Sequence, residues 1–263
     1  LLMRLDISVD LWWRLMVEKR FTNKVVIVTG GSQGIGFACA KRFQEEGAIV
    51  CVIQRSKSKN FESYEFDLSK EKDCLKSIEM IINKHHRIDV LVNNAGMIEE
   101  ALIEDMSLDS WNRTISLNLT APFLMSKYAM QHLIKSEGSI VNIGSIEGLG
   151  ANPKHAAYCA SKAGLHGLTR AIAIDHGADG VRCNAVAPGW IDTALNEDFI
   201  ESTPNPGDFR DNIGKIHPLK RTGKVEEIAS LVAWLASPES SFVTGQVYTV
   251  DGGRMAKLSL PSI

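Results

Sequence analysis

Short apolar runs alternate with longer amphipathic stretches along most of the chain. The first run, 25–28, is β-branched and leads into a glycine-rich turn, after which residues 34–47 place Ile35, Cys39 and Phe43 on one helical face. Runs that are apolar throughout and separated by helices are typical of a parallel sheet covered on both faces. The pattern predicts an α/β fold, a Rossmann-like doubly wound parallel sheet in a single domain. The further strand candidates are 48–53, 64–66, 90–92, 140–143, 181–186 and 247–250.

The beginning of the chain departs from this pattern. We expect residues 1–22 to form an N-terminal extension or tail and 23–263 to form the single Rossmann-like domain. Leu5, Val9 and Trp12 recur at helical spacing, so the alternative is an amphipathic helix that docks on a partner or a second subunit. Charged residues interrupt the apolar ones, which excludes a membrane span, and the pattern of a secretory signal is missing.

A second irregular region runs from Pro188 to about Gly223. Its prolines and glycines predict loop, with short helices expected near 195–201. A long segment of this kind in a compact α/β domain is often a functional lid.

Composition narrows the function classes. Apolar residues make up 44% of the 263 residues and charged residues 23%, so a sizeable core is expected. The net charge of -2, without a run of lysine and arginine, gives no indication of nucleic-acid binding. The five cysteines are scattered and include no CxxC pair, which argues against disulfides and a thiolate zinc site. We therefore expect a cytoplasmic protein with buried free thiols and no metal.

Two motifs point to chemistry. The glycine-rich segment 29–36 lies between a predicted strand and a predicted helix, where backbone amides and the helix N-terminus favour a pyrophosphate. A tight turn without ligand is the alternative. Tyr158 and Lys162 lie one helical turn apart, and an ammonium near a phenol lowers the pKa of that phenol. Such a tyrosine can exchange a proton with an alcohol or a carbonyl, although an exposed helix face shows the same spacing.

The order of these and other motifs resembles the short-chain dehydrogenase/reductase family, in its compact single-domain branch. The resemblance covers nearly the whole chain from about 24 to 253, and the joint order of the motifs is far more specific than any one of them. It implies an NAD(P)-dependent oxidoreductase that moves a hydride between a nicotinamide and a secondary alcohol or ketone. The matching elements are 29–36, Asn93-Asn94-Ala95-Gly96, Asn118, Ser145, Tyr158 with Lys162, and Pro188-Gly189.

The resemblance also implies roles for four catalytic residues. Tyr158 is the general acid or base, and Lys162 lowers its pKa and holds the nicotinamide ribose. Ser145 hydrogen-bonds the substrate oxygen, and Asn118 holds a water that links Lys162 to solvent. Taken one at a time, Ser145 could instead be a helix cap and Asn118 a polar helix residue. If every matching residue had such a structural role, several coincidences at matching positions would be required.

Further positions are assigned to the cofactor by the same resemblance. Asp67 would meet the adenine edge, with an N-cap before a helix at Leu68 as its alternative. The expected cofactor contacts are Gly30, Ser32, Gln33, Gly34, Ile35, Gly36, Gln54, Arg55, Asp67, Leu68, Asn94, Ala95, Gly96, Tyr158, Lys162, Pro188, Gly189, Ile191 and Thr193.

The residues after the second predicted strand bear on the choice of cofactor. A carboxylate there would bond the 2′-hydroxyl of NAD(H), whereas this chain has Gln54 and Arg55. Arg55 can take a 2′-phosphate, and Lys57 and Lys59 add positive potential. NADP(H) is therefore favoured. NAD(H) stays open because Gln33 stands where many NADP-using relatives carry a basic residue, and Gln54 can bond an unphosphorylated ribose.

The expected substrate is a small molecule. Glu147, His155 and Trp190 are the candidate pocket residues, and with Asn152, Asp192 and Asn196 they make a polar neighbourhood that suits a sugar or polyol. His155 could instead face solvent. The resemblance also permits 3-oxoacyl-thioester reduction or hydroxysteroid oxidation.

Assembly and non-enzymatic functions complete the expectations. The family implies a homo-oligomer, a tetramer or a dimer, built on the helices within 106–136 and 158–180 and on the strand 246–250. A nicotinamide-sensing binding module and a scaffold that reuses the fold are the non-enzymatic alternatives. Neither alternative requires Ser145, Tyr158 and Lys162 together. All three residues are present, which favours the enzyme.

Overall fold

The computed structural model describes residues 19–258. Within them a 7-stranded sheet has the order β3-β2-β1-β4-β5-β6-β7, and neighbouring strands run parallel. This confirms the predicted doubly wound α/β fold; the expected amphipathic helix near the N-terminus lies outside the described residues. The strands are β1 (Val25–Thr29), β2 (Ile49–Gln54), β3 (Glu62–Glu65), β4 (Val90–Asn93), β5 (Ser139–Ile143), β6 (Arg182–Pro188) and β7 (Val247–Val250).

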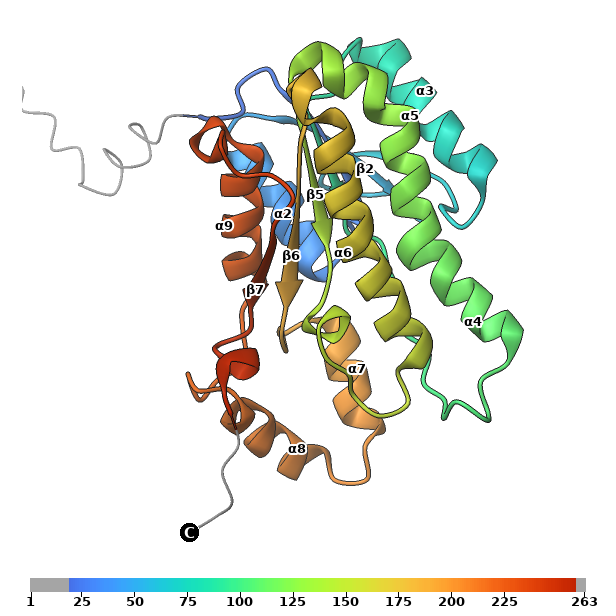
Figure 1. Ribbon diagram of the computed structural model, residues 1–263, viewed down its shortest axis with the longest axis vertical. Coiled ribbons are helices and arrows are strands. Elements are labelled where there is room, and N and C mark those ends of the chain that lie inside the picture. Colours follow the sequence, from blue (N-terminus) through green and yellow to red (C-terminus); the bar gives the residue numbers. More distant parts are fainter. Residues whose placement is uncertain (1–18, 259–263) are drawn as a thin grey trace, which may run out of the picture.

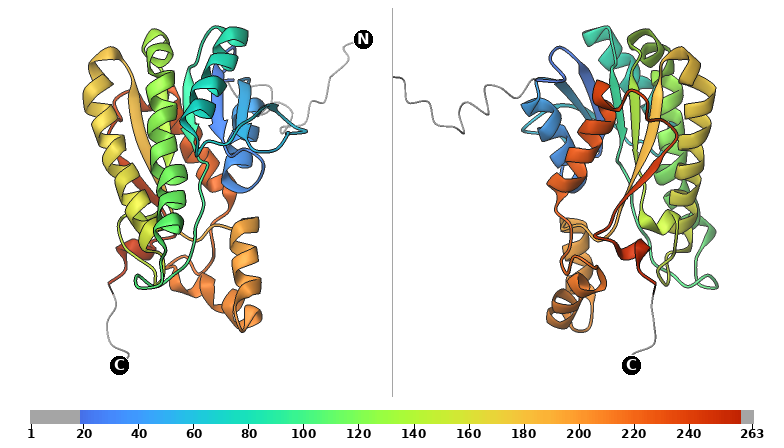
Figure 2. Two further views of the ribbon diagram at one scale, coloured as in Figure 1. Left: turned by 90° about the vertical axis from the view of Figure 1, so that its right-hand side faces the viewer. Right: turned by 60° about the vertical axis from the view of Figure 1, so that its left-hand side comes forward.

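Alternation along each strand builds two apolar layers. In β1, Val26 and Val28 face the layer that packs on α2 (Gly34–Glu45) and α9 (Val225–Ala236). Val25 and Ile27 face the layer beneath the opposite helices, which Figures 1 and 2 show on the other side of the sheet. Because both faces are covered, every residue of β1 is buried. The opposite helices are α3 (Glu71–His85), α4 (Leu108–Ile115), α5 (Ala121–Ser136) and α6 (Ala156–His176).

Short helical turns interrupt or join these elements. The most unusual is a π-helical turn, Ser116–Thr120, between α4 and α5, a feature that is frequent at functional sites. The 3₁₀ turns are Ile146–Gly148, Gly177–Asp179, Gly214–Ile216, Pro238–Ser240 and Arg254–Ala256.

The region predicted as largely irregular contains two helices. The expected short helix is present as α7 (Ala194–Ser202), but the prediction of loop beyond it is wrong, because α8 occupies Pro206–Ile213. Pro206 stands at the start of α8, where its missing N–H and fixed φ favour a helix. Both helices form an arm beyond the carboxyl ends of the strands, as Figure 2 shows. Trp190, Phe199 and Phe209 hold the arm together, with ring centroids 5.4–5.7 Å apart.

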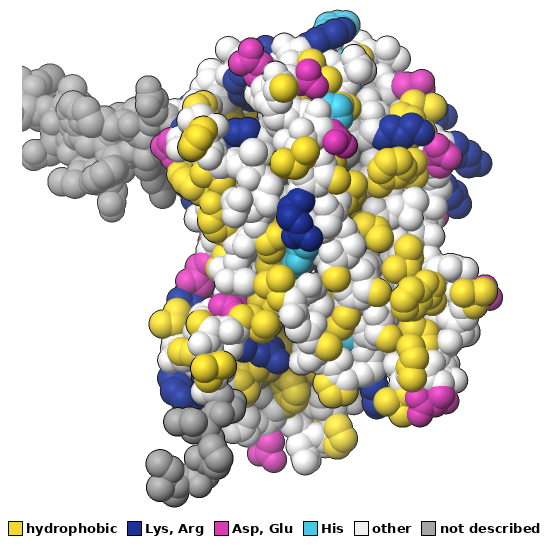
Figure 3. All heavy atoms as spheres, viewed as in Figure 1, with side chains coloured by type: hydrophobic (Ala, Val, Ile, Leu, Met, Phe, Trp, Pro, Cys, Tyr) yellow, Lys and Arg dark blue, Asp and Glu magenta, His cyan; other side chains and the backbone are white. Residues whose placement is uncertain are grey.

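Two further observations concern the helices and the surface of the described residues. Within residues 19–258, no helix combines the length and apolar character needed to span a membrane. On the face drawn in Figure 3, basic and acidic side chains are interspersed, without a continuous basic area.

Candidate active site

A cleft opens where the carboxyl ends of the central strands meet. Strand order reverses between β1 and β4, and in open α/β sheets ligands bind at such a switch point. The cleft has a volume of about 1080 Å³. All of the predicted cofactor contacts, from Gly30 to Thr193 along the sequence, line it. It is large enough for a dinucleotide and a small substrate together.

The glycine-rich segment forms the floor of this cleft. Gly30 and Gly34 have φ of 68° and 56°, values that favour glycine. Gly36 allows the first turn of α2 to press against the loop, because a Cβ on it would lie 2.2 Å from the Gly30 carbonyl oxygen. The glycines therefore serve a left-handed turn and a close backbone approach, as a pyrophosphate cradle requires.

The motif after β4 braces that loop. Thr29 Oγ1 accepts hydrogen bonds from the backbone N–H of Asn94 at 2.9 Å and of Ala95 at 3.0 Å. The Asn94 side-chain amide donates to the carbonyl oxygens of Thr29 and Gly30, both at 3.0 Å. The two ligand-facing loops are thus locked to each other before any ligand arrives.

The N-terminus of α2 fits an anion. Its N-cap residue, Gln33, makes no side-chain capping bond. The first N–H groups of the helix therefore keep their donor capacity, and the helix dipole adds a favourable partial positive charge. Together with the cradle, this end of the cleft fits the pyrophosphate of a dinucleotide.

The adenosine end is built by the ends of β2 and β3. Gln54 donates to the carbonyl oxygen of Ser56 at 2.8 Å, and its own side-chain oxygen is buried without a partner among residues 19–258. Arg55 lines the cleft and makes no ion pair among residues 19–258. Asp67 accepts hydrogen bonds from the backbone N–H and the hydroxyl of Ser69, which lower the Asp67 carboxyl pKa. Leu68 is buried beside it.

Asp67 caps a turn and not the helix. α3 begins at Glu71, later than the helix start expected at Leu68, because Asp67 and Lys70 first close a turn. The Asp67 side chain bonds this turn and still lines the cleft, so the capping and the cofactor-facing interpretations are compatible.

Three of the four predicted catalytic residues meet in the middle of the cleft. Tyr158 and Lys162 come from α6, and Ser145 follows β5. Ser145 accepts a hydrogen bond from the N–H of Glu147 at 3.1 Å, so it does cap a short helix, and its own proton stays available to a ligand. Lys162 is buried and donates to the carbonyl oxygen of Ile143 at 2.8 Å.

Asn118 lies behind the cleft wall and not in its lining. It occupies the π-helical turn, and its amide clamps the backbone of Met97, accepting from the N–H and donating to the carbonyl, both at 2.8 Å. It also donates to Ser161 Oγ at 3.2 Å. A Cβ at Gly96 would lie 3.3 Å from Asn118 Oδ1 and 3.7 Å from Lys162 Nζ, so the amide and the ammonium flank the same glycine.

Burial controls the titration of the central pair. It raises the pKa of Tyr158 to about 12, while the Ser145 hydroxyl lowers that pKa by a smaller amount. Burial also lowers the pKa of Lys162 to about 8. Lys162 Nζ lies 5.6 Å from the ring centroid of Tyr158 and donates to Ile143, and its expected lowering of the Tyr158 pKa stays a prediction. Burial, which spacing on a helix does not reveal, is the largest effect on the pKa of both groups.

Beside Tyr158 the cleft is polar. Glu147 accepts from His155 Nδ1 at 2.7 Å and from the amide of Asn152 at 2.9 Å. The hydrogen bond that His155 donates to Glu147 raises the pKa of His155 despite burial. Burial raises the pKa of Glu147, but the bond and charge of His155 outweigh it and the net pKa is lowered. His155 is therefore a pocket residue and not a surface one, with 12% of its side chain exposed.

Other polar groups of this region were not identified from the sequence. Glu100 lies 3.5 Å from His155 Nε2, because Ala101 forms a backbone bridge to His155. Arg254, from the turn after β7, donates to Asn152 Oδ1 at 3.1 Å and lines the cleft. Neither residue belongs to a motif, and both arrive by tertiary contact alone.

The segment after β6 supplies the opposite wall. Pro188, Gly189, Trp190, Ile191 and Thr193 all line the cleft. Thr193 caps α7, and its side chain is the nearest neighbour of Gly34, so the arm and the glycine loop touch. Asn196 lines the cleft as predicted, whereas Asp192, counted as a pocket residue, is absent from the lining because the chain turns there toward Gly223.

The fold and this cleft define a nicotinamide-dinucleotide-dependent oxidoreductase of the α/β class. A glycine cradle, an uncapped helix N-terminus, a half-buried tyrosine and a buried lysine and serine lie along one cleft.

Comparison with known proteins identifies the family. A family model described as enoyl-(acyl carrier protein) reductase matches residues 30–254. Meso-2,3-butanediol dehydrogenase of Serratia marcescens is 37% identical over 255 residues, 93% of this chain and 99% of that relative. The 3-oxoacyl-[acyl-carrier-protein] reductase of Thermotoga maritima is 37% identical over 249 residues, 89% of this chain and 98% of that relative. The ligand-free structure of Thermoplasma acidophilum aldohexose dehydrogenase matches with a TM-score of 0.89 at 38% identity, over 94% of this chain and 99% of that one.

The chain therefore belongs to the short-chain dehydrogenase/reductase family. It is an NAD(P)-dependent oxidoreductase that acts on CH–OH groups, as predicted from its motifs.

Proposed function

We propose that this enzyme oxidises a hydroxylated small molecule, a sugar or polyol, or reduces the corresponding ketone, with NADP(H) as the favoured cofactor. The observation that carries the proposal is the polar network of Glu147, Asn152, His155 and Arg254 beside Tyr158. The Glu147 carboxylate accepts from His155, Asn152 and the thiol of Cys159 and keeps further acceptor capacity, and Arg254 keeps donor capacity. Such groups favour a substrate with several hydroxyls and leave unpaired polar atoms against a bare apolar ketone.

The proposed proton chemistry rests on Tyr158, Ser145 and Lys162. When bound, the nicotinamide gives or accepts the hydride. The raised pKa of Tyr158 keeps its phenol neutral, so the hydroxyl is ready to donate a proton to a carbonyl oxygen. Ser145 donates to the same oxygen and stabilises the charge that develops on it. Lys162 holds a buried positive charge next to Tyr158, which favours loss of the phenol proton during donation. Asn118, with its side chain held by Met97, fixes the wall behind Lys162, and its water relay stays a prediction.

The preference for NADP(H) is supported by the adenosine end of the cleft. Arg55 lines it without a carboxylate partner among the described residues and can bind a 2′-phosphate in bidentate fashion. The buried oxygen of Gln54, which has no partner in the described part of the chain, is an acceptor that a ribose hydroxyl of NAD(H) would satisfy, so NAD(H) remains the second cofactor.

We also propose a homo-oligomer in a reducing compartment such as the cytoplasm. Phe123 on α5 and Ile174 on α6 expose 47% and 83% of their surface, whereas Met125 and Met130 are buried in the core of the monomer. All five cysteines are free, as expected for such a compartment. A dimeric or tetrameric mass by light scattering is expected, and a monomer at micromolar concentration would contradict this assembly.

Initial rates across a substrate panel test the proposal. The panel should hold sugars, polyols, simple secondary alcohols, a hydroxysteroid and a 3-oxoacyl thioester, each with both cofactors. We expect turnover of a polyhydroxylated substrate and a rise of about tenfold or more in its KM in Glu147→Gln, because a hydrogen bond to a charged group contributes about 1.5–3 kcal/mol. Preferred turnover of the thioester or the steroid, with KM unaffected by Glu147→Gln, would replace this substrate class by that one.

A further inference from the structure

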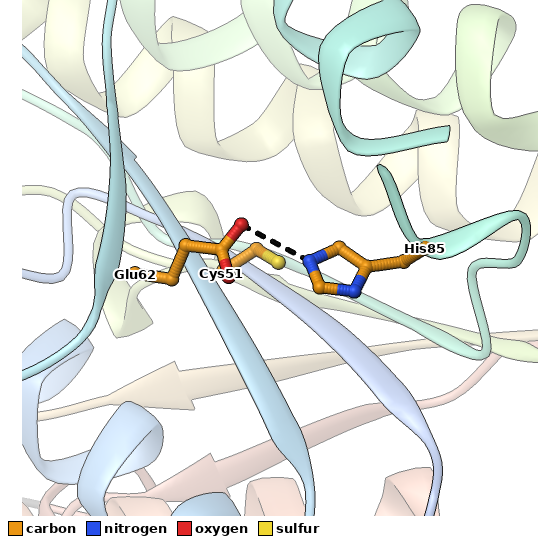
Figure 4. Close-up of side chains that lie close together, drawn as sticks. All are labelled: Cys51, Glu62 and His85. Carbon is orange, nitrogen blue, oxygen red and sulfur yellow. Dashed lines mark hydrogen bonds and ion pairs between the residues drawn. The ribbon is translucent and has the colours of Figure 1, made fainter. Parts of the chain in front are cut away.

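Three potential metal ligands converge away from the catalytic cleft. Cys51 on β2, Glu62 on β3 and His85 at the end of α3 each offer one ligand atom, and these atoms lie within 4.8 Å of one another. Figure 4 shows the three side chains pointing toward a common point from three separate elements. The register that pairs Cys51 with Glu62 places the thiol and the carboxylate side by side. None of the three lines the cleft.

The ligand set matches a particular kind of ion. Thiolate, imidazole and carboxylate are the ligands of zinc, whereas magnesium and calcium prefer oxygen alone. In a tetrahedral zinc site, bonds of about 2.0–2.3 Å place neighbouring ligand atoms roughly 3.4 Å apart. His85 Nε2 and Glu62 Oε1 are 3.0 Å apart, so small side-chain rotations reach that geometry.

The carboxylate is also supported by a second layer of hydrogen bonds. The Tyr64 hydroxyl donates to Glu62 Oε1, and Lys84 Nζ lies 2.8 Å from Glu62 Oε2. Ligating carboxylates in metal sites are characteristically held in this way.

Two of the three side chains reach the surface. Glu62 and His85 expose 28% and 12% of their side chains, while Cys51 is fully buried. Because zinc binds the thiolate, binding has to release the proton of the Cys51 thiol.

We propose that Cys51, Glu62 and His85 form a binding site for a zinc-class divalent transition-metal ion, with a fourth position for water. The bound ion links β2 and the edge strand β3 to the end of α3. Both strands continue into the adenosine end of the cleft, at Arg55 and Asp67. The competing explanation is a closed cluster in which Glu62 is satisfied by its present partners and takes no metal.

Titration with Co²⁺ distinguishes the two explanations, because cobalt bound by a thiolate shows a near-ultraviolet charge-transfer band. The purified, metal-free, reduced full chain is titrated, and we expect one equivalent to produce the band and Zn²⁺ to abolish it by displacement. Cys51→Ser should remove the band. The matched control is Cys159→Ser, which removes a thiol that also lies near a glutamate and a histidine, and it should keep the band.

A second pair of variants covers the case in which Cys51→Ser fails to fold. His85→Gln keeps the buried thiol and should weaken Co²⁺ and Zn²⁺ binding at least about tenfold, whereas His86→Asn, at the neighbouring helix cap, should not. Zn²⁺ should raise the thermal midpoint of the parent and of His86→Asn but not of His85→Gln. Absence of the band in the parent, or equal binding by His85→Gln and His86→Asn, would overturn the site.

Discussion

Replacing Gly36 by alanine tests whether the cradle depends on close backbone contact. The added Cβ would lie 2.2 Å from the Gly30 carbonyl oxygen and 2.3 Å from Asn94 Nδ2, where ordinary contact begins at 3.4 Å. The loop must therefore move by about an ångström. That movement breaks the two hydrogen bonds from the Asn94 amide to the Thr29 and Gly30 carbonyls.

The sizes of the opposing energies decide whether Gly36→Ala loses or gains stability. Overpacking costs about 1–3 kcal/mol and each lost hydrogen bond about 0.5–1.5 kcal/mol, whereas alanine gains only about 1 kcal/mol of helix propensity over glycine. We expect a net loss of roughly 1–5 kcal/mol in unfolding free energy and a thermal midpoint lower by several degrees. Because the displaced loop carries the pyrophosphate cradle, cofactor affinity should fall about tenfold or more.

Fluorescence titration with each reduced cofactor and thermal unfolding measure both effects. The matched control is Gly167→Ala in α6, where a Cβ would meet nothing within 4 Å. That variant should keep its cofactor affinity and gain about 0.5–1 kcal/mol of stability. The reasoning is refuted if Gly36→Ala binds cofactor as tightly as Gly167→Ala.

Two further predictions concern charge. Arg55→Asp should move the ratio of kcat/KM for NADP(H) over NAD(H) toward NAD(H) by at least tenfold, and an unchanged ratio would reject Arg55 as a phosphate ligand. For His155→Gln, the loss of unfolding free energy relative to the parent should be largest between about pH 4.5 and 6.5. Because the pKa of His155 is raised, the stability that its charge contributes is lost as the pH rises through that pKa. Because the pKa of Glu147 is lowered, the stability that its charge contributes is lost as the pH falls through that pKa. Denaturant unfolding across pH 4–9 measures this difference, and a constant difference would contradict the pairing.

The sequence was sufficient for the architecture because its strands are apolar on both faces. The continuous run of β1, with every residue buried, has one physical solution, a sheet covered on both sides. The glycine loop could also be predicted from the sequence, since the positive φ of Gly30 and Gly34 and the close contact at Gly36 each require a glycine. The sequence does not predict α8, because Pro206 can indicate the end of a helix as well as its start.

The electrostatics of the site could not be predicted as well from the sequence. The raised pKa of Tyr158 follows from burial, and spacing along a helix gives no measure of burial. Glu100 and Arg254 reach the cleft from segments without a motif, through a backbone bridge and a turn after the last strand. Cys51, Glu62 and His85 could not be grouped from the sequence, because strand register and helix packing alone bring them together.

Steady-state turnover by Tyr158→Phe tests the central claim most directly. The hydroxyl of Tyr158 is the proposed proton donor, and positioned general acids contribute about 10²–10⁴-fold. The account predicts that kcat/KM with the best substrate falls by at least about a hundredfold, with cofactor affinity retained. The control is Tyr128→Phe on α5. It removes an exposed hydroxyl that donates to Glu71 of α3, and it should keep parental activity. Turnover by Tyr158→Phe equal to that of Tyr128→Phe would contradict the proposed chemistry.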